Sequence, residues 1–175
     1  MIQHGFDMYR VYLSTPGDLS REYDACHAAI SEINSEEAME KRVLLVTVGL
    51  REDAQIIGFR SAVSENVRAC TYFIQVFQDD WGPRDLFRKL FLLAAECRDD
   101  ASMPMRDVVV CLKDAPHETN AEILAFRAEL AEHSDMRMFR YGNPDELRAQ
   151  LTEVCEGWAQ AAITSRTGAE AASGA

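Results

Sequence analysis

Short apolar runs alternate along the chain with longer segments in which apolar residues recur every three or four positions. A short run rich in β-branched and aromatic residues predicts a strand, and the longer period predicts an amphipathic helix. The predicted strands are residues 8–14, 43–48, 72–77, 108–112 and 136–141. The predicted helices carry apolar stripes over 23–33, 59–67, 86–94, 123–130 and 147–158, and the first should run to residue 39.

Strands that alternate with helices are typical of an α/β domain whose mainly parallel sheet is covered on both faces. Right-handed crossovers leave few arrangements, and the commonest for five strands has the order 2-1-3-4-5. In that order a ligand crevice lies at the carboxyl ends of the first and third strands. We therefore expect residues 14–18 beside residues 78–82, and the weak fifth strand at an edge.

Helix-start signals mark the ends of several loops. Thr15 is a candidate capping residue because Pro16 would take the first helical position, and Asp18 is an equal candidate. Residues 119–122 and 143–146 each match a capping box, in which a polar cap is followed three positions later by an acid.

The chain length of 175 residues is that of one ordinary domain with its own core. We expect an N-terminal extension over 1–7 and one α/β domain over 8–161. Residues 162–175 are small and polar without an apolar stripe, which predicts a disordered tail.

The net charge of −11 and the lack of a Lys/Arg cluster argue against nucleic-acid binding, which calls for a basic face. No apolar run approaches the ~20 residues of a membrane helix. Residues 1–7 lack the basic and apolar regions of a signal peptide. These features favour a cytoplasmic protein that contacts neither nucleic acid nor a membrane.

The five cysteines are odd in number and form no C-x-x-C motif, so we expect reduced, buried thiols. The four histidines have no metal-ligand spacing, so we expect no metal centre.

The first candidate site is the segment that joins the first strand to its helix. Backbone N–H groups at such a helix start attract phosphate or carboxylate, and hydroxyls there can bind a ribose. The alternative is a plain helix cap. The segment is neither a Walker loop nor a dinucleotide fingerprint. The candidate ligand-binding residues are Ser14, Thr15, Pro16, Gly17 and Asp18.

The second candidate site is the loop after the third strand. Trp81 could stack on a base or nicotinamide ring, and Arg84 could pair with a phosphate. The alternative is that Trp81 closes the core and that the side chains of Asp79 and Asp80 are solvated. Asp80 and Gly82 complete this set of candidate ligand-binding residues.

Glu96, on the third predicted helix, is the candidate catalytic acid. A carboxylate near the crevice could stabilise the cationic sugar that forms when an N-glycosidic bond breaks. The alternative is that Glu96 is an exposed helix residue without a catalytic role, because most glutamate side chains in folded proteins are exposed.

The stretch from Val11 to Leu19, with Glu22 and Asp24 behind it, resembles the opening motif of a TIR-like family catalogued as a domain of unknown function. That motif reads Ser-Ser/Thr-Thr-x-x-Asp-Leu-x-x-Glu-Arg-Asp, and Tyr23 stands here where Arg is usual. A second block, from Cys70 through the Trp-Gly pair at 81–82, is similar to the family's Cys-Asp-x-Phe-Ile strand and aromatic-Gly turn.

The resemblance implies a TIR-like, flavodoxin-like fold and a role in bacterial signalling or defence. Many TIR domains bind or cleave NAD through a Glu on the helix after the third strand, and others only assemble with partners. In this chain Leu90 stands where that acid is common, and Glu96 lies six residues later on a different part of the helix surface. The opening is also similar to that of nucleoside deoxyribosyltransferases, without their helix motif.

Three functions therefore remain open. The first is a signalling module that needs no cofactor, recognises NAD or ADP-ribose, and assembles with itself or a protein partner. The second is an NAD glycohydrolase or related N-glycosidase that uses Glu96 or a loop acid. The third is a protein–protein adaptor that binds no nucleotide.

Overall fold

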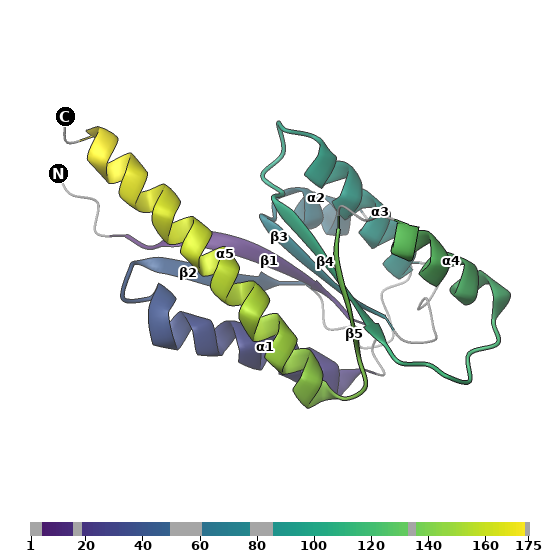
Figure 1. Cartoon of the computed structure of the whole chain (residues 1–175). Helices are drawn as coiled ribbons and strands as arrows, with labels where there is room; N and C mark the ends of the chain where they lie inside the picture. The colour runs from purple at the N-terminus through teal and green to yellow at the C-terminus, as the bar shows by residue number, and fades with distance from the viewer. Residues whose placement is uncertain (1–4, 16–18, 50–60, 78–85, 133–135, 174–175) are drawn as a thin grey trace.

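The computed structural model describes residues 5–15, 19–49, 61–77, 86–132 and 136–173. Strands and helices alternate through this part of the chain (Figure 1). The strands are β1 (Asp7–Ser14), β2 (Val43–Val48), β3 (Tyr72–Phe77), β4 (Asp107–Lys113) and β5 (Arg137–Tyr141). The helices are α1 (Ser20–Ile33) with a π-helical extension η1 (Asn34–Ala38), α2 (Ser61–Arg68), α3 (Leu86–Asp99), α4 (Ala121–Glu132) and α5 (Pro144–Ser173).

The sheet has the order β2-β1-β3-β4-β5, and every neighbouring pair is parallel. This confirms the predicted α/β class, the flavodoxin-like topology and the position of β5 at an edge. Residues 43–48 and 72–77 also match the predicted strands at both ends. β2 is the other edge strand, and four of its six residues are only partly buried although all but Thr47 are apolar.

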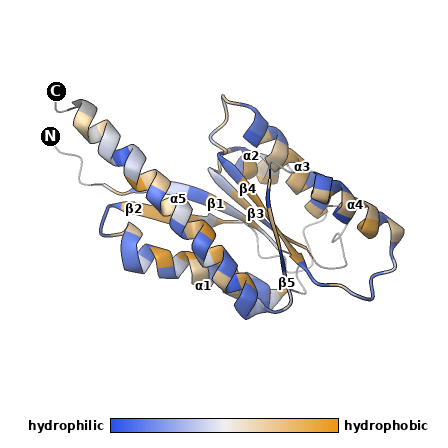
Figure 2. Cartoon of the chain, viewed as in Figure 1, coloured by the Kyte–Doolittle hydropathy of each residue, from blue (hydrophilic) through white to orange (hydrophobic). Residues whose placement is uncertain are grey.

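Helices cover both faces of the sheet, which makes three layers (Figure 1). Side chains of α1 and α5 form one core with the first face, and side chains of α2, α3 and α4 form a second core with the other face. Figure 2 shows hydrophilic and hydrophobic residues interspersed along these helices, as expected for elements with one buried side.

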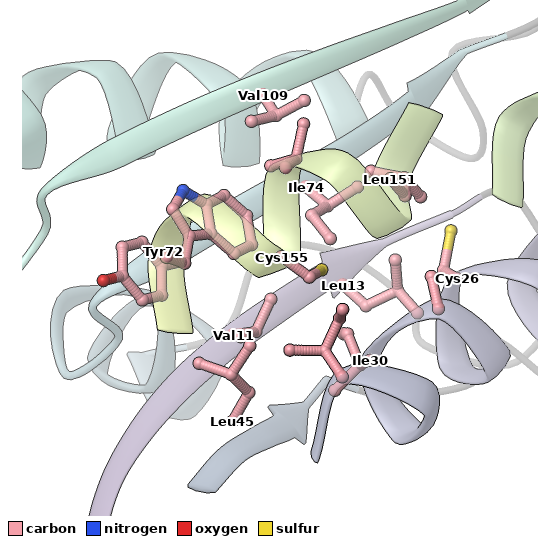
Figure 3. Close-up of a cluster of buried hydrophobic side chains, with 14 of the residues drawn as sticks. Val11, Leu13, Cys26, Ile30, Leu45, Tyr72, Ile74, Val109, Leu151 and Cys155 are labelled. Atoms are coloured by element: carbon pink, nitrogen blue, oxygen red, sulfur yellow. The ribbon is translucent and has the colours of Figure 1, made fainter. Parts of the chain in front are cut away.

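The core beneath α1 and α5 holds tightly packed aromatic and aliphatic groups (Figure 3). The rings of Tyr72 and Trp158 stack with centroids 4.3 Å apart. The indole Nε1–H of Trp158 donates to Asp107 at 2.8 Å, so the last helix is fixed to the start of β4. Cys26 and Cys155 reach this core from α1 and α5.

The helix caps follow the sequence signals in part. Asn143 accepts from the N–H groups of Asp145 and Glu146 at 3.1 and 3.0 Å, so the predicted cap of α5 is present. In α4 the cap is Asn120, which accepts from Glu122 N–H at 2.9 Å. In α1 the residue before Ser20 is Leu19, which makes no side-chain cap hydrogen bond.

The C-terminal segment differs from the expected disordered tail, because α5 continues as a helix to Ser173. Ala162 is fully buried, and the Arg166 guanidinium lies 2.8 Å from the Asp7 carboxylate. The alanine-rich sequence lacks a stripe, but its high helix propensity suffices once the first turns are packed. None of the helices in the described residues combines the length and hydrophobicity that a bilayer-spanning segment needs.

Candidate functional site

The two central strands end side by side at the point where the chain reverses direction across the sheet. Ser14, the last residue of β1, is the register partner of Gln75 in β3. From β1 the chain crosses to the edge strand β2, and from β3 it crosses the other way to β4. Ligands of open α/β sheets bind at such a switch point, outside the carboxyl ends of the strands.

Gln75 is a polar residue in the middle of the sheet and is fully buried. Its neighbours at alternate positions, Phe73 and Phe77, belong to the core under α2, α3 and α4, so Gln75 faces the same side. The Gln75 Nε2–H₂ group donates to the carbonyl oxygens of Ser14 at 3.2 Å and Val76 at 3.3 Å.

Three polar atoms at this end of the sheet are buried without a hydrogen-bond partner among the described residues. They are the hydroxyl oxygens of Ser14 and Thr15 and the Oε1 atom of Gln75. Ser14 is 3% exposed and Thr15 is 7% exposed, so bulk water does not solvate them. A buried polar group left unpaired costs about 1–3 kcal/mol, which makes such a group a sign of a bound water or ligand.

A second polar group lies at the same end of the sheet but on the opposite face. The Lys113 Nζ donates to the Glu22 Oε1 at 2.6 Å, and Glu22 is almost fully buried. Lys113 ends β4 and Glu22 lies in the first turn of α1. The ion pair therefore ties the start of α1 to the carboxyl end of β4.

Tyr141, at the end of β5, lies close to this ion pair. Its hydroxyl is buried and has no hydrogen-bond partner in the described part of the chain. Burial raises the pKa of Tyr141, and the negative charge of Glu22 raises it further. The phenol is therefore neutral at physiological pH and retains a proton that it can donate.

Glu96, the candidate catalytic acid, is not brought to this end of the sheet. It lies exposed in the last turn of α3, which leads to the amino end of β4. Glu96 is about 15 Å along the helix axis from Leu86, the first residue of α3. Because α3 runs antiparallel to the strands, this distance separates Glu96 from the carboxyl ends of the strands. Leu90 is buried in the core under α3, as an apolar residue at that position should be.

The remaining predicted site residues lie outside the described residues. They are Pro16, Gly17 and Asp18 after β1, and Asp80, Trp81, Gly82 and Arg84 after β3. Their proposed contacts with a ligand stay predictions.

All five cysteines are free and buried, in agreement with the sequence analysis. Burial raises the pKa of Cys70 and of Cys155 to about 12, so these thiols are protonated and poor nucleophiles at neutral pH. Within the described ranges, His, Cys, Asp and Glu side chains form no group of three that could hold a metal ion.

Sequence reasoning did not single out Gln75, Lys113 or Tyr141 as functional candidates, and it used Glu22 only as part of a motif. Gln75 carried a usable signal, because it is the one strongly polar residue in an otherwise apolar and aromatic strand. The Glu22–Lys113 pair carried none, since its members are 91 positions apart and meet only through the topology.

The comparisons with known proteins add no family to this geometry. A scan against protein-family models finds no match, and a search of curated proteins finds no significant relative.

Proposed function

We propose that this domain is a cytoplasmic, TIR-like signalling or defence module that recognises a nucleotide such as NAD or ADP-ribose. Recognition takes place at the carboxyl ends of β1 and β3, and the module acts by self-assembly or with a protein partner rather than by robust catalysis. The observation that carries the proposal is the set of three buried, unpaired polar atoms on Ser14, Thr15 and Gln75 at the switch point.

Buried hydroxyl and amide groups without a hydrogen-bond partner suit an uncharged, hydrogen-bonding part of a ligand. A ribose or a carboxamide presents such groups, and both occur in NAD. The switch point of a 2-1-3-4-5 sheet is a common nucleotide position, which supports a nucleotide as the class of ligand. The resemblance of the β1 end to the TIR-like opening motif points in the same direction.

The position of Glu96 supports recognition over cleavage. An acid that assists loss of nicotinamide must reach the reacting sugar within hydrogen-bond distance or through one water. Glu96 is exposed near the amino ends of the strands, and the unpaired atoms lie near the carboxyl ends. Glycohydrolase activity through Glu96 therefore has no geometric support.

Titration calorimetry of concentrated protein with NAD and with ADP-ribose tests the proposal. Ser14→Ala should weaken binding about tenfold, because it removes one hydrogen-bonding group from a buried site. The matched control is Ser165→Ala on α5, whose exposed hydroxyl donates to the Ala161 carbonyl and should leave affinity unchanged.

Nicotinamide release should be measured in the same samples. Binding without release is the expected result. Release that Glu96→Ala abolishes would establish the glycohydrolase instead, and the absence of both binding and release would favour the adaptor.

A further inference from the structure

The orientation of the Gln75 side-chain amide is fixed by its surroundings. Both groups that contact Nε2 are backbone carbonyl oxygens, of Ser14 and Val76. A carbonyl can only accept, so the NH₂ end of the amide must point toward them. The Oε1 atom is thereby held on the other side as an acceptor, with no donor among the described residues.

The partner that this arrangement lacks is a hydrogen-bond donor. Ser14 lies beside Gln75 on the neighbouring strand, about 4.8 Å away in the pairing direction. The Ser14 side chain shares a sheet face with Tyr12, which belongs to the same core as the neighbours of Gln75. The Ser14 and Gln75 side chains therefore lie on the same face of two paired strands, and the Ser14 hydroxyl oxygen, like the Gln75 Oε1, is a buried atom that can accept a hydrogen bond.

A planar NH₂ group carries two N–H donors and can therefore serve two acceptors on one face of the sheet. A carboxylate carries none, and it would place negative oxygens against the Gln75 Oε1 in a buried setting, which is strongly unfavourable. A keto oxygen in place of the NH₂ fails for the same reason.

We infer that Gln75 is a specificity-determining residue that recognises an NH₂ group of the ligand, either a primary carboxamide or an aromatic amine. The inference rests on the proposed function and deepens it. It assigns to one buried acceptor, the Gln75 Oε1, the discrimination between a nucleotide that carries the NH₂ group and an analogue that carries a carboxylate or an oxo group in its place, with the Ser14 hydroxyl as a second acceptor.

Three dinucleotides separate the sources of the NH₂ group. NAD carries both a carboxamide and an adenine amine. Nicotinic acid adenine dinucleotide replaces the carboxamide by a carboxylate, and nicotinamide hypoxanthine dinucleotide replaces the amine by an oxo group. We expect the wild-type protein to bind one of these two analogues at least tenfold more weakly than NAD in calorimetry.

Gln75→Met removes the acceptor at nearly constant volume. We expect this variant to bind NAD more weakly and to bind the disfavoured analogue within about twofold of NAD. Gln75→Asn, which keeps an amide but withdraws its oxygen, should behave the same way and serves if the methionine variant fails to fold. Ser165→Ala is the control that should retain wild-type discrimination.

The outcomes distinguish this inference from the function beneath it. Equal binding of all three dinucleotides to the wild-type protein would overturn the role of Gln75 and leave nucleotide recognition intact. A uniform loss for all three in Gln75→Met would assign the contact to a ligand hydroxyl and would also overturn the inference. If no dinucleotide binds, the proposed function and the inference both fail.

Discussion

Single buried polar residues are the features of this domain that the hydrophobic pattern does not explain. Ser14, Thr15 and Gln75 are enclosed at the ends of two central strands, where an apolar side chain would pack without cost. Glu22 is buried as well, but it is compensated by Lys113 at 2.6 Å. In the function that we propose, the unpaired residues mark the ligand position, whereas the Glu22–Lys113 pair is a structural tie.

We predict that Glu22→Gln lowers the free energy of unfolding by about 1–3 kcal/mol, because Lys113 keeps its charge in a largely buried place without its counter-ion. Chemical denaturation measures the change. Lys113→Met should restore part of the loss when combined with it, since both charges are then gone.

The matched control for that experiment is an exposed ion pair. Arg148 lies 2.8 Å from Glu32 between α5 and α1, with both side chains substantially exposed. Glu32→Gln should cost less than about 1 kcal/mol. If Glu22→Gln costs no more than Glu32→Gln, the Glu22–Lys113 pair does not tie α1 to the sheet.

At the scale of elements, the sequence predicted most of what local patterns can encode. Residues 43–48 and 72–77 are apolar, β-branched or aromatic runs bounded by polar segments, and their strand ends were correct. The strand order followed from general rules of connection. The site was harder to predict from the sequence. The hydrogen bonds of the Gln75 side chain depend on the backbone carbonyls of Ser14 and Val76, and only the folded sheet brings the Ser14 carbonyl within reach.

At the end of α5 the sequence pattern predicted less structure than the chain has. Residues 162–173 have no apolar stripe, yet the helix continues because buried Ala162 and paired Arg166 hold its next turns against the domain. A small alanine contributes little to hydropathy patterns but allows close packing.

Truncation tests that packing. Removing residues 162–175 should lower the melting temperature by several degrees, because the buried Ala162 and the Arg166–Asp7 ion pair are lost. Removing only residues 168–175 should leave it nearly unchanged. Equal melting temperatures for the two truncated proteins would show that residues 162–167 contribute nothing to stability.

At the scale of the whole molecule, the buried thiols couple stability to alkaline pH. Burial raises the pKa of Cys155 from 9.0 to about 12 and raises that of Cys70 by a similar amount. Between these values the unfolded chain loses thiol protons that the folded chain keeps. The free energy of unfolding should therefore fall as pH rises from 9 to 12, by up to about 1.4 kcal/mol per pH unit for each such thiol.

Denaturation at a series of pH values from 8 to 11 measures this slope. The stabilising contribution of these thiols is complete below pH 9, so the curve should be flat there with respect to them. Cys155→Ala should have a shallower alkaline slope than the wild-type protein, whatever its stability at pH 8. An unchanged slope would show that the Cys155 thiol ionises alike in the folded and unfolded states.

The unpaired atoms at the ends of β1 and β3 need hydrogen-bond partners, and in the function that we propose NAD supplies them. A crystal structure of the protein grown with NAD tests this most directly. The account predicts ligand atoms within hydrogen-bond distance of the Ser14 hydroxyl and the Gln75 Oε1. Ordered water bonded to both atoms, with NAD absent or bound elsewhere, would contradict it.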